Sequence, residues 1–454
     1  MDERGAADEL SGRDDAAAGR DDAPAAAVGR EKGRLPLLGA FASVFAALRH
    51  RNYRLFFFGQ LVSLVGTWMQ WTAQGWLVYK ITGSKLMLGT VRMAGTLPLA
   101  VFSLFGGVIA DRFPRRTILI VTQSAAMVLP LALAALVFTD TVRVWHIALL
   151  AAALGVVNAF DIPTRQAFVI EMVGREDLMN AIGLNSGVFN SARIIGPAVA
   201  GITMASVGVG FCFLINGLSY AAIIVGLAMM KVRVRAAPPP VGSVWRRIVD
   251  GFAYVRSDRR VMGLFGLLGV VGVFGFSYVV LLPAFARDVF GVAELGYAEM
   301  LTFNGMGAVV GSLVVASVGK RKSGRRNVLF IGVLVFVFSV LAFSFTGRFA
   351  LALVTLPFVG MGMIMFFSTA NTLIQRTVPD AFRGRVMGIW TLVFGGAMPL
   401  GGMYAGVVAE SVGAALAVRI GAGVCAVAAL VAALVGGRIR SADESSVVRD
   451  DVAP

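Results

Sequence analysis

The stretch Gly106-Gly-Val-Ile-Ala-Asp-Arg-Phe-Pro-Arg-Arg116 lies between two long apolar segments of the 454-residue chain. One acid and three arginines crowd into a connection that is short enough to be a tight turn. The whole chain is 57% hydrophobic and 15% charged, whereas soluble domains carry roughly 25% charged residues. We therefore expect a membrane protein in which this turn lies where the membrane ends.

Many segments are apolar and long enough to cross a bilayer as a helix, which takes about 20 residues. We expect twelve of them, at 55–79, 86–110, 117–138, 145–168, 178–205, 211–230, 261–286, 296–318, 327–346, 349–374, 384–409 and 413–436. This predicts an all-α membrane protein with twelve transmembrane helices.

The basic residues of the connections give the orientation. With the N-terminus inside, the inner connections, in which Arg165 is counted, hold most of the Lys and Arg, and the outer ones hold only Lys80, Lys85, Arg143, Arg287, Arg348 and Arg419. Positive connections mark the cytoplasmic side. We expect a multi-pass membrane protein with both termini in the cytoplasm. The net charge of +15 is then a topology signal, and no nucleic-acid partner is expected.

The two halves of the chain repeat each other. Gly106–Arg116 aligns with Gly311–Arg321, in which Ala316 and Ser317 replace the acid and the first arginine. We expect two pseudo-symmetric six-helix bundles with a substrate site between them near the midplane. We expect a disordered cytoplasmic tail at 1–48, the first bundle at 49–230 and the second bundle at 261–437. Between the bundles, 231–260 is expected to be a cytoplasmic linker with an amphipathic helix on the inner membrane surface, and 438–454 a cytoplasmic C-terminal tail.

The turn resembles the loop 2–3 motif of the major facilitator superfamily, with Pro114 where the family usually has Gly. The matching residues are Gly107, Asp111, Arg112, Arg115 and Arg116. The resemblance implies a gate that stabilises the outward-open state and responds to protonation. In physical terms, a glycine lets two helices approach, and an acid can pair with an arginine or face a helix N-terminus across the halves. The alternative is that the arginines only anchor the topology.

The fifth expected helix carries a second motif. Gly183, Gly196, Pro197 and Gly201 resemble the antiporter motif of drug and metabolite exporters, with Ala at 192 and 200. The resemblance implies an exporter, and ordinary packing of small residues is the alternative. Three stretches are similar to bacterial exporters of the enterobactin exporter and transmembrane secretion effector group: Asn52-Tyr-Arg54-Leu-Phe56, Asp161-Ile-Pro163-x-Arg165-Gln166 and Asn185 to Pro197. The resemblance covers essentially residues 50–436 and implies the cytoplasmic (inner) membrane of a bacterium. The arginine that many drug/proton antiporters place in the fourth helix is missing at 151–155.

A polar stripe on the first helix predicts a cavity wall. The stripe consists of Gln60, Ser63, Thr67, Gln70 and Gln74, whose spacings of three and four place them on one face of the helix. The alternative to a cavity wall is that these side chains make hydrogen bonds between helices. Arginines at membrane depth need a partner or a wet cavity and either attract an anionic substrate or pair structurally, with a backbone carbonyl, Asp161 or Glu299. The predicted substrate cavity comprises Ser63, Thr67, Gln70, Gln74, Trp71, Arg92, Asp161, Arg193 and Asn371.

The sequence offers no chemistry of its own. Its two cysteines and two histidines form no metal cluster, and it has no P-loop, so we expect no enzyme activity, no metal and no cofactor. The prediction is a secondary transporter that exports small organic molecules (a siderophore, an antibiotic or another amphiphilic metabolite or drug) by alternating access and proton antiport. The expected proton carriers are Asp111, Asp161 and Glu299. Its partners would be the lipid bilayer, the substrate and protons, and it would act as a monomer. The alternatives are an importer and a non-transporting scaffold or sensor.

Overall fold

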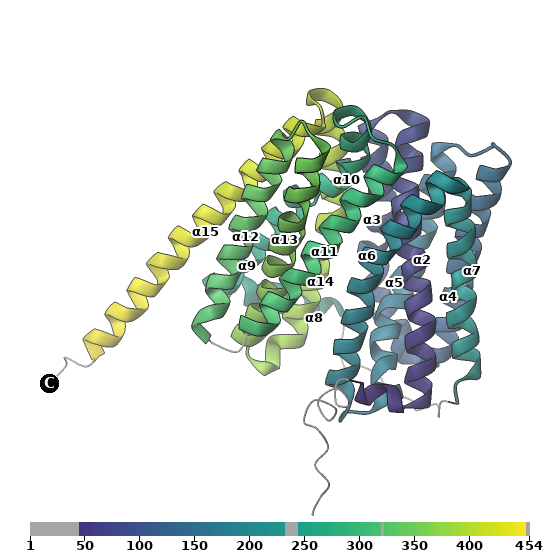
Figure 1. The fold of residues 1–454 in the computed structure, drawn as a ribbon. Coiled ribbons are helices and arrows are strands. Elements are labelled where there is room, and N and C mark those ends of the chain that lie inside the picture. Colours follow the sequence, from purple (N-terminus) through teal and green to yellow (C-terminus); the bar gives the residue numbers. More distant parts are fainter. Residues whose placement is uncertain (1–44, 232–243, 319–321, 451–454) are drawn as a thin grey trace, which may run out of the picture. The chain divides into compact units, whose positions relative to one another are not determined.

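In the computed structural model, residues 45–231, 244–318 and 322–450 are described, with the side chains at 104, 108, 111, 244–248, 322–324 and 435–450 left out. Every regular element in these residues is a helix (Figure 1). The elements are η1 Ala46–Arg49, α2 Arg51–Thr82, α3 Lys85–Arg112, α4 Arg115–Phe138, α5 Val144–Val173, α6 Leu178–Ser206, α7 Val209–Met229, α8 Val244–Ser257, α9 Arg259–Val270, η2 Val271–Gly275, α10 Ser277–Ala284, η3 Phe285–Val289, α11 Glu294–Val318, α12 Lys322–Phe345, α13 Phe349–Thr377, α14 Asp380–Val412 and α15 Ala414–Asp450.

The all-helical membrane fold is confirmed. Within the described residues, 11 helices are long and apolar enough to cross a membrane. The predicted first span is helix α2, which is not among them because its polar stripe lowers its hydropathy. The predicted spans agree with the helices to within a few residues, except that α15 continues to Asp450. The seventh span is one helical series, α9–η2–α10–η3, which contains two π-helical segments.

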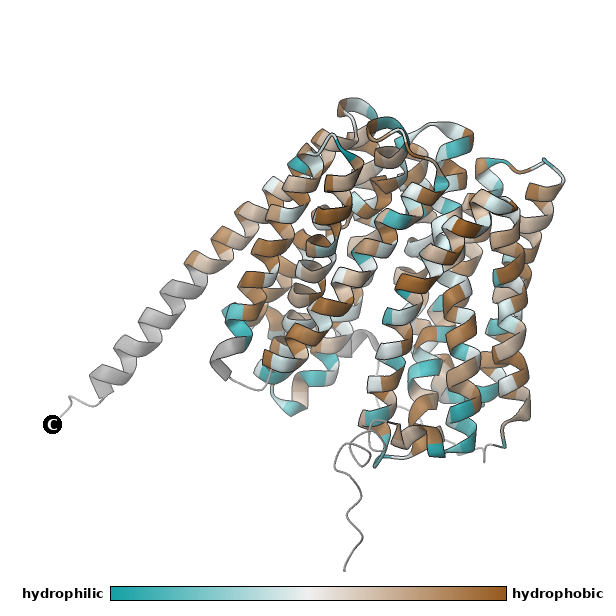
Figure 2. Cartoon of the chain, in the orientation of Figure 1, coloured by the Kyte–Doolittle hydropathy of each residue, from teal (hydrophilic) through white to brown (hydrophobic). Residues whose placement is uncertain are grey.

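The surface of the helices suits a bilayer. Hydrophobic residues dominate the middle of the helices, and polar residues gather near their ends (Figure 2). Large apolar side chains are exposed along them, among them Phe58, Phe105, Leu149, Ile202 and Phe338. A soluble protein does not leave so much apolar surface in water, so these side chains are placed to contact lipid.

The described residues from Phe45 onward belong to one compact unit, and residues 1–44 of the predicted tail lie outside the described residues. The predicted tail therefore includes a few ordered residues: the amide of Ala47 in η1 donates to Asn180 at 2.9 Å. The linker helix α8 packs on α14, where a Cβ on Gly251 would lie 3.0 Å from the carbonyl oxygen of Arg385. Of its predicted apolar face, Val255 is buried and Phe252 is exposed, and Trp245 and Ile248 lie outside the described side chains.

Two long crossings join helices α2–α7 to helices α9–α15. They are α3 against α14 and α6 against α11. In each crossing the helices run antiparallel, so each has one end at the Gly106–Arg116 turn, called here the turn end, and one at the opposite side, called the far end. These crossings position the site described next.

Candidate functional site

The deepest cation of the first half is Arg193 of α6, whose residue surface is only 8% exposed. Its Nη2 donates to Oδ1 of Asn304 on α11 at 3.1 Å. Its guanidinium also lies over the ring of Trp68 on α2, 5.9 Å from the centroid. Among the described residues it has no carboxylate partner, so the predicted alternative of a pair with Asp161 or Glu299 is not what the structure contains.

Asn304 joins this arginine to the second half. Its Nδ2 donates to the Tyr278 hydroxyl at 3.0 Å and to the Leu356 carbonyl oxygen at 3.3 Å. The amide is 3% exposed and makes bonds on both sides, as a buried amide should. Gly305 lets the backbones meet here, because a Cβ on it would lie 2.9 Å from the Arg193 carbonyl oxygen. The guanidinium is therefore held at the contact between the halves.

A second arginine lies on the other crossing. The guanidinium of Arg92 on α3 lies 5.5 Å from the ring centroid of Trp71. The Arg92 side chain packs on α14, since a Cβ on Gly402 would lie 3.2 Å from the Arg92 Cγ. Trp68 and Trp71 are in edge contact at 5.1 Å. Two arginines from two helices thus converge on one tryptophan pair of α2. Cation–π contact compensates part of the cost of a desolvated arginine but leaves its charge without a counterion.

The polar stripe of α2 mainly faces α7. Asn216 donates a short hydrogen bond to Gln70, and the Thr67 hydroxyl lies 3.4 Å from that of Tyr220. Ser63 is buried as well, and Gln74 is half-buried. The Gln60 side-chain oxygen is buried without a partner among the described residues. For Thr67 and Gln70 the structure contains the interhelical hydrogen bonds of the alternative reading.

Asp161 belongs to a different cluster. It is 1% exposed, pairs with Arg165 one turn later on α5, and accepts hydrogen bonds from Thr122 at 2.9 Å and Gln123 at 2.7 Å on α4. Arg165, counted in a connection by its charge, lies inside α5. The pair lies inside the first half and is not joined to Arg193. Its part in proton transfer stays a prediction.

Two further predicted residues lie apart from the arginines. Asn371 accepts a 2.5 Å hydrogen bond from Gln375 on the same helix. At 1.5 Å per residue, it lies roughly 20 Å along α13 from Leu356, which Asn304 contacts. Glu299 is half-buried on α11. The roles of both stay predictions.

The motif at the turn mostly ties the first half together. Arg115 pairs with Glu171 of α5 at 2.6 Å, and Arg116 donates to the carbonyl oxygens of Leu227 and Ala228 at 2.7 Å each. Such bonds cap the end of α7. Arg112 ends α3 and is exposed. Asp111 is the residue before it, and its side chain lies outside the described set.

The close helix approach expected of Gly107 is made by its neighbour. A Cβ on Gly106 would lie 2.0 Å from the Ala159 carbonyl oxygen of α5, whereas one on Gly107 would meet nothing within 4 Å among the described residues. A Cβ on Gly107 would thus not contact α5 in the described part of the chain. The role predicted for Gly107 at a close helix contact therefore stays a prediction.

The motif on α6 divides between two partners. A Cβ on Gly196 would lie 2.4 Å from the Trp68 Cβ on α2, and one on Gly201 would lie 2.6 Å from the Ala298 Cβ on α11. Pro197 lies inside the helix between them. Gly183 has open space around it among the described residues. Close packing therefore accounts for Gly196 and Gly201 but not for Gly183.

The far end holds charged contacts that sequence reasoning missed. Asp288 of η3 accepts a short hydrogen bond from Tyr79 of α2 and pairs with Lys85 of α3 at 3.2 Å. Arg287 donates to the Tyr79 carbonyl oxygen at 3.3 Å. Trp76 stacks on Tyr297 of α11 with centroids 5.8 Å apart. Because the partners come from distant helices, no local pattern in the sequence indicates these contacts.

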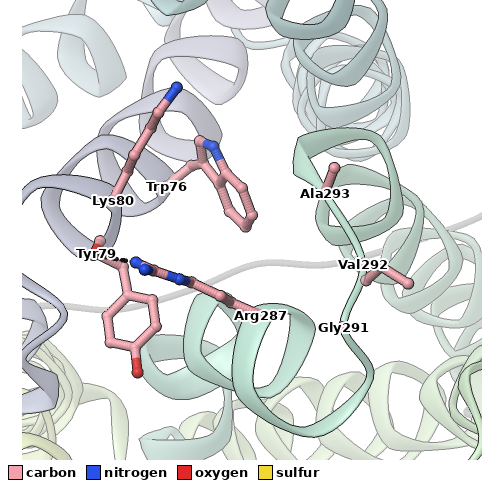
Figure 3. A pocket seen from close by; sticks show the side chains of 7 residues that line it. All are labelled: Trp76, Tyr79, Lys80, Arg287, Gly291, Val292 and Ala293. Atoms are coloured by element: carbon pink, nitrogen blue, oxygen red, sulfur yellow. Dashed lines mark hydrogen bonds between the residues drawn. The ribbon is translucent and has the colours of Figure 1, made fainter.

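A pocket of about 380 Å³ opens beside these contacts (Figure 3). Its lining comes from α2 on one side and from η3 and the loop before α11 on the other. The lining residues are Trp76, Tyr79, Lys80, Arg287, Gly291, Val292 and Ala293. The charged side chains of its lining, Lys80 and Arg287, are both positive, and the lining residues come from both halves of the chain.

At the turn end, one acid ties η1 to α6. Asp177 accepts hydrogen bonds from His50 at 2.7 Å and from Arg49 at 2.8 Å. These two bonds, that of His50 first, hold the pKa of the Asp177 carboxyl below its usual value. The cluster is structural and lies within the first half.

The fold, the family model and the relatives identify a multi-span membrane transporter of the major facilitator type rather than an enzyme. The chain belongs to the transmembrane secretion effector family, whose model matches residues 42–452. The predicted superfamily and subgroup are confirmed.

Relatives of this chain are efflux and siderophore transporters. It is 25% identical to the staphyloferrin A transporter of Staphylococcus aureus, over 79% of this chain and 90% of that protein. It is 28% identical to the multidrug efflux pump Tap of Mycolicibacterium fortuitum, over 79% and 89%. It is 23% identical to macrolide efflux protein A of Streptococcus pyogenes, over 80% and 92%.

Solved structures share the fold at low identity. The nucleoside transporter NupG has a TM-score of 0.67 at 13% identity, covering 84% of this chain and 98% of that one. A bacterial homologue of ferroportin in an inward-facing state has a TM-score of 0.65 at 15% identity, covering 84% and 98%. At this identity the likeness concerns the fold alone.

Proposed function

We propose that this protein exports small amphiphilic organic molecules that carry an acidic group, driven by the proton gradient. The names of its relatives, which include a siderophore transporter and drug efflux pumps, support export of such molecules. The observation that carries the substrate class is the pair Arg92 and Arg193 on the Trp68–Trp71 pair. Two cations without a described counterion beside aromatic faces suit an organic anion with a flat apolar part.

The glycines of the two crossings support alternating access. On α3, Gly89 and Gly107 lie on one face about five turns apart, since 107 − 89 = 18 and a turn takes about 3.6 residues. The same spacing relates the pairs Gly183 and Gly201, Gly384 and Gly402, and Gly388 and Gly406.

Within the described part of the chain, the far-end glycine of every pair is in contact and the turn-end glycine is not. A Cβ on Gly89 would lie 2.3 Å from the Gly402 carbonyl oxygen, and one on Gly406 would lie 3.1 Å from the Gly89 Cα. The turn-end members, Gly107, Gly183, Gly384 and Gly388, meet nothing within 4 Å among the described residues. We infer that the turn-end glycines are the contact faces of a second state in which that end closes.

The positive connections support a cytoplasmic turn end. In that orientation the conformation described here is closed to the outside, and the arginines would be reached from the cytoplasm, as an exporter requires for loading. The proton carriers that we propose are Asp111, Asp161 and Glu299.

Transport into inverted membrane vesicles tests the proposal. The probes are staphyloferrin A as an acidic siderophore, erythromycin as a macrolide, and carboxyfluorescein as a simple organic anion. We expect uptake of the acidic probes that is lost when the proton gradient is collapsed, and a loss of about ten-fold or more in Arg193→Gln. Arg143→Gln, outside the site, should transport like the parent. Uptake of the acidic probes that is unchanged in Arg193→Gln would refute the site.

A further inference from the structure

The start of α3 takes part of its N-terminal cap from the other half of the chain. The first N–H groups of a helix have no partner inside the helix. Ser84 Oγ accepts from the Met87 amide at 3.3 Å. The amides of Lys85 and Leu86 instead donate to Oε2 of Glu410, at 2.7 and 3.1 Å. Glu410 lies near the end of α14, so the cap comes from the second half of the chain.

The same carboxylate is bound on its other oxygen. Ser84 Oγ donates to Glu410 Oε1 at 3.1 Å, so both oxygens are bound to the first turn of α3. A negative charge at a helix N-terminus is also favoured by the helix dipole. One side chain of α14 thereby completes the end of a helix in the opposite half.

Two neighbouring features make this cap part of the far-end closure. One turn before Glu410 on α14, Gly406 packs on Gly89, which is one turn into α3. Lys85, whose amide is bound by Glu410, also pairs with Asp288 through its side chain. The charged and titratable groups around Glu410 are thus Lys85, Tyr79 and Asp288, with Arg287 over the Tyr79 ring.

We propose that Glu410 is a positioning residue of the transport cycle, an interdomain cap that holds the far end closed by completing the α3 N-terminus. When the halves separate at the far end, the amides of Lys85 and Leu86 lose the Glu410 carboxylate and form hydrogen bonds with water instead. Removing the charge therefore favours the state that is open at the far end and closed at the turn end. This inference rests on the alternating access proposed above.

Hydrogen–deuterium exchange of the whole protein in lipid nanodiscs, without substrate or gradient, tests it. In Glu410→Gln we expect the peptide that spans the start of α3 to exchange roughly five-fold faster. Peptides at the turn end, over the last turn of α3 and the first turn of α14, should exchange more slowly than in the parent. Glu410→Asp, which keeps the charge, should restore part of both effects.

Asp140→Asn is the matched control, because Asp140 is an exposed far-end acid at a left-handed position that Asn also suits. It should exchange like the parent. Faster exchange at the far end without slower exchange at the turn end would mean a local cap only and would overturn the proposal, as would no change at all. The measurement needs no substrate, so a failure of the vesicle assay leaves it interpretable.

Discussion

At the scale of single residues, Arg193 depends on one amide. The guanidinium is nearly buried and its described hydrogen-bond partner is Asn304, which in turn binds Tyr278 and the Leu356 carbonyl oxygen. Breaking a buried polar relay costs the desolvation of whatever is left without a partner. The Asn304 side chain therefore affects both the stability of the contact between the halves and the position of the Arg193 charge.

Two substitutions at this position should separate stability from charge. Asn304→Leu leaves the guanidinium and the Tyr278 hydroxyl without their partner, and we expect a loss of about 1–3 kcal/mol in stability. Asn304→Asp supplies a counterion to Arg193 but cannot donate to the Leu356 carbonyl oxygen, so we expect a smaller loss of melting temperature than in Asn304→Leu, with loss of acidic-probe transport. Thermal unfolding in detergent and vesicle uptake measure the two effects. Parent-like transport in Asn304→Asp would contradict the anion site.

The Asp177 cluster predicts an acid-sensitive tie between η1 and α6. Because its folded pKa lies below the usual value, its contribution to stability is present above an ordinary Asp pKa of about 3.9 and is lost as the pH falls below it. We expect proteolysis near η1 to accelerate below about pH 4 in the parent and to be fast at every pH in Asp177→Asn. An equal acid response in both proteins would place the titrating group elsewhere.

At the scale of the elements, the two crossings are asymmetric between their ends. A Cβ on each far-end glycine would meet atoms of the other half, whereas one on each turn-end glycine would meet nothing within 4 Å among the described residues. Because a Cβ at 2.3 Å from a carbonyl oxygen cannot be accommodated without a shift, the helices must separate there if a side chain is added. Space at the turn end makes the same change harmless in this conformation.

Adding a side chain at the two ends of α3 should therefore act in opposite directions. Gly89→Val should hinder far-end closure and raise the thiol reactivity of a reporter cysteine at Ala298, which is buried at the far-end contact, by several-fold or more. Gly107→Val should leave this conformation intact but hinder closure of the turn end, so that vesicle transport is lost while the reporter stays as in the parent. Equal effects of both substitutions on the reporter would argue against alternating contacts.

At the scale of the whole molecule, orientation in the membrane is the property that decides export or import. The proposed topology places Lys80 outside and Arg112 inside. Lys80→Cys should react with a membrane-impermeant maleimide in intact cells, and Arg112→Cys only after permeabilisation. The native Cys212 and Cys425 are buried and should give no signal, which makes the unmodified protein the control. The reverse labelling pattern would invert the proposed direction.

The sequence by itself determined the membrane class, the helical fold and the family. These depend on composition, on the length of apolar runs and on short motifs such as the Gly106–Arg116 turn, which are properties of neighbouring residues. It also identified Arg92 and Arg193, since an arginine in an apolar run is conspicuous wherever its partner lies.

Only the tertiary structure decided which residues meet. Asn304 with Arg193, Asp288 with Lys85 and Glu410 with the start of α3 join residues more than 100 positions apart, and no local pattern encodes such pairs. Likewise, Gly106 and Gly107 are neighbouring residues of the same type, and only the packing of α3 against α5 determines which one lies at the contact. Residue types fix what each helix can bind, whereas the crossing geometry of the helices fixes what each one reaches.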